Sequence, residues 1–382
     1  MDSVKDSLTN EILLNPRLTS ADASKLIEVA QTVSEKMKLK SHIWLSTSGS
    51  SSESTVHNKL VALSKDALKA SAEAVNAHLQ VSSADTWLQV LPRFHVGGLG
   101  IEIRASLSNS KVVSDFQKWN PARTHQLLQN NKITIASMVP TQVFDLVKSK
   151  LKAPANLRVI IVGGGALTEA LYREGREWGW PLVPSYGMTE TSAQIATASL
   201  ESLQSNEMPQ LKKLAHVEWR TTSEKLLEVK GPSLMTCYGQ RLKDGSIRGW
   251  DPKVDSWFTT EDHVELQGSY IRVIGRKNDF IKIGGEASSM GRLREIWDRI
   301  TGGRNCQHAV LVDAPSKRLG TVIHLVSTLA EGDPLMAIWR EAFNREVLPF
   351  ERIRDVKYIA QIPRSELGKV LWAQLKRELY VD

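Results

Sequence analysis

The chain has 382 residues, more than the ~250–300 at which single hydrophobic cores stop growing, so we expect two domains. Hydrophobic residues make up 41% and charged residues 24%, an ordinary globular composition that excludes a disordered tail, a collagen and a coiled coil. The formal net charge of +7 is too small an excess to indicate a nucleic-acid-binding protein by itself.

The cysteines and the apolar runs indicate the compartment. Cys237 and Cys306 are the only cysteines and lie far apart, so they give no disulfide framework and favour a reducing compartment. The longest strongly apolar runs, such as residues 159–162, are far shorter than the ~20 residues of a membrane-spanning helix. Residues 1–10 carry charges without an apolar core, which does not fit a secretory signal. We therefore predict a cytoplasmic protein without membrane insertion.

Up to about residue 215, segments typical of strands alternate with segments typical of helices. A helix is predicted after Pro16, with a cap at Ser20 or Asp22, and another over residues 64–79. The predicted strands lie at residues 42–45, 86–91, 132–138, 158–162 and 184–186. Because helices opened by turn residues follow several of these strands, the pattern predicts a largely parallel α/β sheet.

Beyond residue 215 the predicted segments become shorter. Strands bounded by Gly, Pro and Asp, which indicate a small β subdomain, lie at residues 225–230, 246–250, 257–266 and 269–274. After Arg276 the pattern is mixed, with strands near 308–312 and 321–327 and helices near 333–345 and 370–379. The predicted fold class is α/β: a large N-terminal α/β domain with a small β subdomain, followed by a small α+β C-terminal domain.

Two segments rich in small residues follow predicted strands. The first contains Thr47, Ser48, Gly49, Ser50 and Ser51, and the second contains Gly163, Gly164 and Gly165. Composition alone favours a flexible linker for the first and a tight turn for the second. For the first segment, the alternative is a loop whose backbone N–H groups approach phosphate oxygens. Neither segment is a Walker A loop or a dinucleotide-binding fingerprint.

The segment from Tyr186 to Glu190 places different chemical groups side by side at the end of a predicted strand. It supplies the ring of Tyr186, the hydroxyl of Thr189 and the carboxylate of Glu190, with Gly187 between them. Ligands bind at strand ends in open α/β sheets, so this is a candidate ligand site. A turn with solvated charges is the alternative.

Seven segments occur in a recognisable order between Ser46 and Lys369. They are STSGS, LPRFHVGG, VGGGAL, YGMTETS, WFTTEDH, GRKNDFIKIGGE and PRSELGK. Together they resemble the adenylate-forming superfamily of acyl- and aryl-CoA ligases. Residues 14–18, 91–101 and 137–142 are most similar to the o-succinylbenzoate–CoA ligase branch of menaquinone biosynthesis.

This resemblance implies an ATP-dependent acid–CoA ligase that works in two steps. A small-molecule carboxylic acid attacks the α-phosphorus of ATP in the presence of Mg²⁺, giving an acyl-adenylate and pyrophosphate. The thiol of coenzyme A then displaces AMP. The implied cofactors are ATP, Mg²⁺ and coenzyme A, and no nucleic acid is involved.

The same resemblance implies roles for polar residues around the phosphates. Lys369 would bridge the carboxylate and the α-phosphate, Glu190 would hold Mg²⁺, and Thr189 would donate to phosphate. Residues 47–51 would form the phosphate loop, with Lys59 as its lysine. This loop departs from the family pattern, because Ser52 replaces a glycine and Asn58 replaces a proline.

Other residues would hold the nucleoside and the acid. Tyr186 would lie against the adenine, residues 163–165 would let the backbone approach it, Asp262 would accept from the ribose hydroxyls, and Arg276 would add a contact. His95 corresponds to a family residue beside the acyl site. Arg104 would pair with a second carboxylate of the substrate, or else form a surface salt bridge.

The resemblance also divides the chain into a domain at residues 1–276 and a mobile lid at 277–382. Asn278 would be the hinge, and rotation about it would exchange Lys369 for the face that carries Lys282. From Arg276 to Asp382 there are 18 Lys+Arg and 14 Asp+Glu, so this part holds an excess of +4.

In relatives a substantial subdomain precedes the phosphate loop, whereas only some 46 residues do so here. We therefore expect a shortened front whose exposed surface a partner chain covers, as in a homodimer. The alternatives are an adenylating enzyme that loads a carrier-protein thiol, and a non-catalytic relative on a truncated ligase fold. A nucleic-acid binder is disfavoured, since no recognised module is present.

Overall fold

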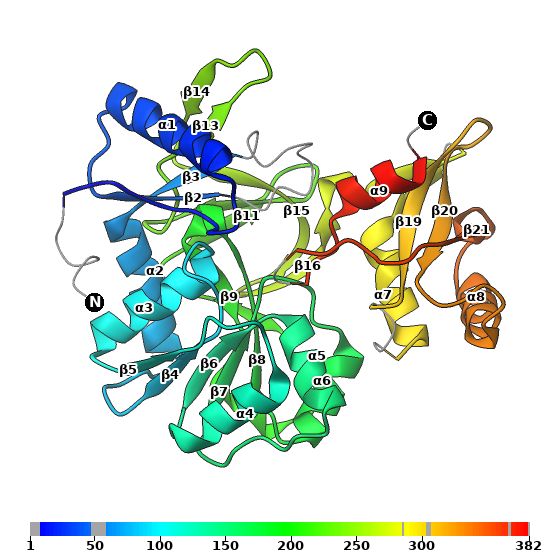
Figure 1. Ribbon diagram of the computed structural model, residues 1–382, viewed down its shortest axis with the longest axis horizontal. Coiled ribbons are helices and arrows are strands. Elements are labelled where there is room, and N and C mark those ends of the chain that lie inside the picture. Colours follow the sequence, from blue (N-terminus) through cyan, green and yellow to red (C-terminus); the bar gives the residue numbers. More distant parts are fainter. Residues whose placement is uncertain (1–7, 47–58, 285, 303–306, 366–367, 381–382) are drawn as a thin grey trace.

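The computed structural model describes residues 8–46, 59–284, 286–302, 307–365 and 368–380. Figure 1 shows most of the helices and strands gathered in one large body, with the elements that follow β16 beside it. Three sheets organise the described residues. The α/β fold class is confirmed.

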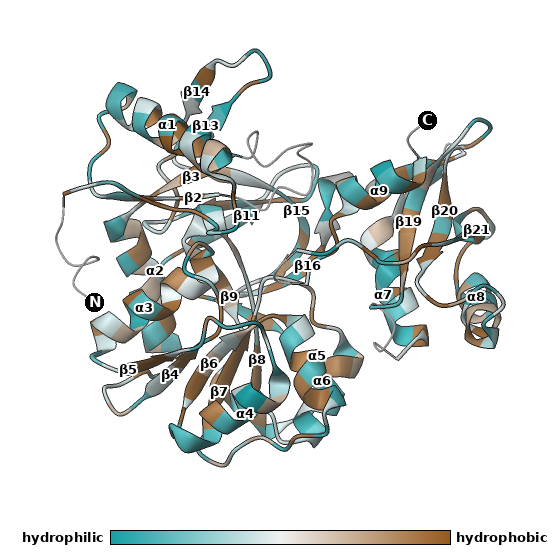
Figure 2. Cartoon of the chain, viewed as in Figure 1, coloured by the Kyte–Doolittle hydropathy of each residue, from teal (hydrophilic) through white to brown (hydrophobic). Residues whose placement is uncertain are grey.

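The largest sheet has eleven strands, and its first half is parallel in the order β5-β4-β6-β7-β8. These strands are β4 (Thr86–Gln89), β5 (Lys111–Ser114), β6 (Ile135–Met138), β7 (Val159–Val162) and β8 (Leu182–Met188). Both faces of this half are covered, so β6 and β7 are buried along their whole length, as parallel strands usually are. Figure 2 shows β6 and β7 mostly in the hydrophobic colour.

Helices cover both faces of the parallel half. Buried side chains of α4, α5 and α6 pack on one face, and those of α2 and α3 pack on the other. The helices are α2 (Lys65–His78), α3 (Val96–Ser108), α4 (Pro121–Asn130), α5 (Pro140–Lys148) and α6 (Glu169–Glu177). Side-chain caps begin three of them, at Ser64, Asn120 and Thr168, and each accepts a backbone N–H of the first turn.

The second half of the large sheet is antiparallel in the order β9-β10-β16-β15-β12-β11. Its strands are β9 (Ala193–Thr197), β10 (Leu211–Lys213), β11 (Glu218–Thr221), β12 (Leu226–Lys230), β15 (Phe258–Gln267) and β16 (Tyr270–Arg276). Two short 3-10 turns, η2 (Thr189–Thr191) and η3 (Leu200–Gln204), flank β9. This half joins the parallel one at the antiparallel pair of β8 and β9.

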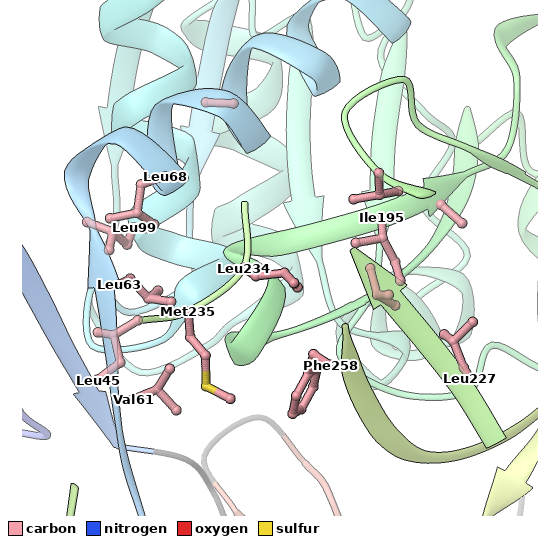
Figure 3. Packing of buried hydrophobic residues seen from close by; sticks show 14 of the residues in the cluster. Leu45, Val61, Leu63, Leu68, Leu99, Ile195, Leu227, Leu234, Met235 and Phe258 are labelled. Atoms are coloured by element: carbon pink, nitrogen blue, oxygen red, sulfur yellow. The ribbon is translucent and has the colours of Figure 1, made fainter. Parts of the chain in front are cut away.

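A five-stranded sheet combines the start of the chain with a later hairpin. Its strands are β1 (Glu11–Leu13), β2 (His42–Ser46), β3 (Leu60–Ser64), β13 (Cys237–Arg241) and β14 (Ile247–Trp250). The strands predicted beyond residue 215 are therefore divided between two sheets. Helix α1 (Ser20–Lys36) packs on this sheet, and its cap is Thr19 and not the predicted Ser20 or Asp22. Figure 3 shows the buried cluster that joins the two sheets, with Leu45, Leu99 and Phe258 among its members.

The third sheet contains the strands that follow Arg276. They are β17 (Phe280–Ile283), β18 (Glu286–Ser289), β19 (Ala309–Ser316), β20 (Gly320–Ser327) and β21 (Ile353–Tyr358). The helices are α7 (Met290–Ile300), α8 (Pro334–Glu346) and α9 (Trp372–Tyr380), with short turns η4 (Lys277–Asp279) and η5 (Pro349–Glu351). Helix α7 and strand β21 were not predicted. Across the described ranges, no helix has the length and apolar character required to span a bilayer.

Candidate functional site

Three of the predicted residues meet where β8, β15 and β16 come together. The Tyr186 hydroxyl donates to Asp262 Oδ2 at 2.6 Å, and Arg276 Nε lies 3.3 Å from Asp262 Oδ1. Asp262 and Arg276 face each other across the β15–β16 pair. The sheet therefore brings together a ring, a carboxylate and a guanidinium from segments far apart in the sequence.

This group holds a carboxylate in a fixed orientation. Asp262 is only 6% exposed, and both of its oxygens have a partner. Burial, followed by the negative charge of Asp262, raises the pKa of Tyr186 well above its ordinary value. The phenol therefore stays protonated and donates, so the carboxylate acts as the acceptor.

The turn after β8 carries Thr189 and Glu190 and has strained backbone. Ser192 and Ala193 have φ of 55° and 102°, values that residues other than glycine seldom adopt. The Thr191 hydroxyl donates to the Ala193 carbonyl at 2.8 Å, and the Glu190 carbonyl accepts from the Met235 amide at 2.8 Å. Neighbouring segments thus hold a strained turn in place, as is common at functional sites.

Gly187 is required by the same turn. A Cβ at this position would lie 1.8 Å from the carbonyl oxygen of Ala193, which is backbone and cannot rotate away. We expect Gly187→Ala to lower the free energy of unfolding by about 3 kcal/mol, since overpacking against rigid structure costs roughly 1–3 kcal/mol. Urea unfolding would measure this. The control is Gly165→Ala, whose Cβ would make only ordinary contacts, and equal stabilities of the two variants would contradict the prediction.

Glu190 has a partner that sequence reasoning missed. The Tyr238 hydroxyl on β13 donates to Glu190 Oε1 at 2.9 Å, and the Lys59 ammonium lies 4.7 Å from the centre of the Tyr238 ring. Burial and then the charge of Glu190 raise the pKa of Tyr238. Tyr238 reaches this place because β13 pairs with β3, opposite Val61, and no local sequence signal reveals that pairing.

The Glu190 carboxylate suits one kind of metal site. In the part of the chain that the structure describes, no three His, Cys, Asp or Glu side chains are grouped as metal ligands. Mg²⁺ is commonly held by one or two carboxylates together with water and substrate phosphates. Glu190, a single carboxylate fixed by Tyr238, fits such a site better than a closed protein cage.

Lys369 lies in the C-terminal segment, where hydrogen bonds join it and Gly368 to the described residues before them. The Ser365 amide donates to the Lys369 carbonyl at 2.7 Å, and Arg364 Nη1 donates to the Gly368 carbonyl at 2.9 Å. A Cβ at Gly368 would lie 2.6 Å from the Thr141 side chain, so the loop rests against the start of α5.

The surroundings of the Lys369 ammonium change its proton affinity. Although the residue keeps an exposed surface, burial of the ammonium lowers its pKa, and the positive charge of Arg276 adds to this. The loop therefore brings Lys369 within electrostatic reach of the guanidinium that contacts Asp262.

Arg104 was predicted either to contact a substrate carboxylate or to form a surface salt bridge, and the structure does not place it at the surface. It is 2% exposed, and burial lowers its pKa to about 10. Its Nε and Nη1 have no hydrogen-bond partner among the described residues, and its Cζ lies 5.6 Å from the centre of the Trp87 ring. The predicted surface salt bridge is wrong, because α3 buries this side chain against β4.

The remaining predicted residues, His95 and Gly163 to Gly165, lie in segments next to the parallel strands. His95 precedes α3, and the centres of its ring and that of Phe94 are 4.6 Å apart. A Cβ at Gly163 would lie 2.8 Å from Ser185 Oγ, and Gly164 has a φ of 75°, so both positions favour glycine. Gly165 follows them in the same turn.

Some predictions fall elsewhere. Thr47, Ser48, Gly49, Ser50 and Ser51 lie outside the described residues. Asn278 lies in η4, and Lys282 is exposed on β17, in the third sheet. Within the described ranges, no hydrogen bond or ion pair joins Lys282 to Glu190, Asp262 or Arg276.

Residues 43–238, just over half of the chain, match the model of a protein family described as AMP-binding enzyme. The 2-succinylbenzoate–CoA ligase of Oceanobacillus iheyensis is 26% identical over 314 residues, which cover 79% of this chain and 63% of that protein. The ligase of the same name from Bacillus subtilis is 27% identical over 313 residues, with coverages of 78% and 62%. The chain thus spans less than two thirds of the length of these curated relatives.

Solved structures share the fold. The o-succinylbenzoate–CoA synthetase of Bacillus subtilis in complex with its acyl-adenylate intermediate aligns with a TM-score of 0.77 at 22% identity, covering 96% of this chain and 83% of that one. The same enzyme in complex with AMP aligns with a TM-score of 0.73 at 24% identity, covering 87% and 68%. At these identities the likeness concerns the arrangement of helices and strands.

Proposed function

Because the chain belongs to the AMP-binding enzyme family, we propose that it is an ATP-dependent acid–CoA ligase that acts on 2-succinylbenzoate. The observation that carries the proposal is the assembly of Tyr186, Asp262 and Arg276, with Lys369 close enough to Arg276 for their charges to interact. These four polar groups come from separate segments, and the fold alone does not require them to meet. The substrates are ATP, coenzyme A and a small carboxylic acid.

The nucleoside would bind against Tyr186 and Asp262. A buried carboxylate with one phenol donor and one guanidinium is a prepared acceptor for the two hydroxyls of a ribose. Arg276 is exposed and can turn towards phosphate or ribose while Tyr186 keeps the carboxylate oriented. Residues 163–165 would let the backbone approach the adenine, because two of these positions favour glycine.

The phosphates would meet Glu190, Thr189, Lys59 and Lys369. Mg²⁺, held by Glu190, would neutralise phosphate charge. Lys369 would bring the acid and the α-phosphate together, since phosphoryl transfer depends mainly on positioning and on neutralising charge. The loop at residues 47–51 would complete the phosphate site.

The second step would require movement of the C-terminal part. We propose a domain at residues 1–276 and a lid at 277–382, with Asn278 as the hinge. The change from the eleven-stranded sheet to the third sheet between β16 and β17 supports this boundary. Rotation about the hinge would withdraw Lys369 and bring in the β17 face with Lys282 for the attack of coenzyme A. A cytoplasmic homodimer remains part of the proposal, and sedimentation velocity would test its oligomeric state.

Arg104 would recognise the acid together with His95. The substrate 2-succinylbenzoate carries a second carboxylate on its ring, and Arg104 has two buried donors without partners. We expect Arg104→Met to raise the KM for 2-succinylbenzoate about 10- to 100-fold, because charged hydrogen bonds contribute roughly 1.5–3 kcal/mol. Steady-state kinetics would measure this.

The free energy of unfolding of Arg104→Met shows whether a rise in KM comes from lost substrate recognition or from a weakened fold. Because burial penalises the Arg104 charge, Arg104→Met should leave the free energy of unfolding unchanged or raise it. The KM for 4-oxo-4-phenylbutanoate, which lacks the ring carboxylate, should stay constant. An equal rise in KM for both acids would contradict a contact with that carboxylate.

Pyrophosphate release from the purified chain with ATP and Mg²⁺ tests the function itself. The screen covers aromatic and aliphatic acids, and we expect the highest rate with 2-succinylbenzoate. Supplying coenzyme A or a carrier protein then identifies the thiol acceptor. Absence of release with every acid would reject the ligase function and favour a non-catalytic relative.

A further inference from the structure

One carboxylate connects the predicted hinge to helix α7. Asp279, at the end of η4, accepts from the Arg276 backbone amide through Oδ2 at 3.1 Å. Its other oxygen, Oδ1, accepts from Arg294 Nη1 at 2.9 Å. The backbone at the end of β16 and the side chain of Arg294 are therefore tied to the same group.

The opposite side of Arg294 meets an aromatic ring. Its Cζ lies 3.8 Å from the centre of the Trp372 ring, well within the range of a cation–π contact. Burial is the largest influence on Arg294 and lowers its pKa, and Asp279 opposes this. A cation–π contact is stronger when the cation is desolvated, so Arg294 joins Asp279 to Trp372 more firmly than an exposed arginine would.

Trp372 begins α9, three residues after Lys369. Helix α9 is fixed to the third sheet, because Leu375 is fully buried and Lys376 Nζ lies 2.6 Å from Asp313 Oδ2. Lys369 and Gly368 are hydrogen-bonded to Ser365 and Arg364, the described residues that precede them. Because only Val370 and Leu371 separate Trp372 from Lys369, a displacement of the ring would be passed on to the lysine.

We propose that Arg294 is a positioning residue for Lys369, which it holds towards Arg276 through the chain Asp279–Arg294–Trp372. The inference rests on the proposed function, in which Lys369 acts in the formation of the adenylate. Loss of Arg294 would remove the contact between the start of α9 and the hinge and let Lys369 shift. A shift of about 1 Å in a positioned group can cost about 100-fold in rate.

The two half-reactions provide the first test. In Arg294→Gln we expect acid-dependent pyrophosphate release to fall about 10- to 100-fold, whereas supplied acyl-adenylate and coenzyme A react at the wild-type rate. Arg294→Lys keeps the cation and should recover part of the rate. The control is Arg299→Gln on the same helix, which removes only an exposed ion pair to Glu346.

A second test asks whether Arg294 acts through Lys369. In a Lys369→Ala background, adding Arg294→Gln should cause no further loss of pyrophosphate release. A loss as large as in the wild-type background would overturn the proposal, because it would show that Arg294 acts on the fold in general. If the wild type releases no pyrophosphate, the proposed function fails instead.

The third measurement does not depend on activity. Limited digestion with trypsin reports local opening, and mass spectrometry identifies cleavage after Arg364 and Lys369. We expect cleavage there to be several-fold faster in Arg294→Gln and unchanged in Arg299→Gln. Equal rates in both variants and the wild type would overturn the proposal whatever the activity of the protein.

Discussion

Replacing Lys369 with alanine should lower the rate of acid-dependent pyrophosphate release by about 100- to 1,000-fold. The loss of a preorganised charge that stabilises the transition state costs roughly 2.7–4 kcal/mol in other enzymes, which corresponds to this range. The reaction of supplied acyl-adenylate with coenzyme A should keep its wild-type rate. A quenched-flow measurement of each half-reaction would separate the two steps.

The control for this variant is Lys357→Ala, which removes a partly exposed lysine paired with Asp355 on strand β21. Equal losses in both half-reactions of Lys369→Ala would contradict a role confined to adenylation. The pH profile gives a further check. Lys369 is charged below its pKa, and burial lowers that pKa, so adenylation should decline with rising pH sooner than for an ordinary lysine.

Replacing Asp262 with alanine should lower kcat/KM for ATP about 100-fold or more. Two hydrogen bonds to a charged acceptor would be lost, and each contributes roughly 1.5–3 kcal/mol. Tyr186 and Arg276 would also lose the group that orients them. Isothermal titration with ATP would show the same loss in affinity without any acid present.

The matched control is Glu265→Ala on the same strand, an exposed carboxylate paired with Arg272. We expect wild-type kinetics for this variant. If Asp262→Ala binds ATP as the wild type does, Asp262 is only a structural partner of Tyr186. Thermal unfolding of both variants would show whether a weaker fold explains any loss.

The sequence predicted β4, β6, β7 and β8 of the parallel half, because they are short runs with buried apolar residues, and it missed β5. It could not predict the pairing of Asp262 with Arg276. A β-bulge between His263 and Val264 shifts the β15–β16 register by one residue, and a slip of one residue turns every side chain to the other face. Nothing in the local pattern reveals this bulge.

Long-range pairing explains the remaining misses. Tyr238 contacts Glu190 only because β13 joins β3, and strand partners so distant in the sequence have no local signal. The burial of Arg104 has a similar origin. Because arginines are usually exposed, a surface salt bridge was as reasonable an expectation for Arg104 as contact with a substrate carboxylate. Tertiary packing instead buries its side chain beside Trp87.

The split of the late strands between two sheets has a consequence for synthesis on the ribosome. Strand β3 ends at Ser64, but its neighbour β13 begins only at Cys237. At about 5–20 residues per second, the edge of β3 waits roughly 10–40 s for its partner. During that time Leu60 and Ala62, which are fully buried in the finished fold, lie on an open apolar edge. The nascent chain is therefore a candidate client of ribosome-associated chaperones until the β13–β14 hairpin emerges.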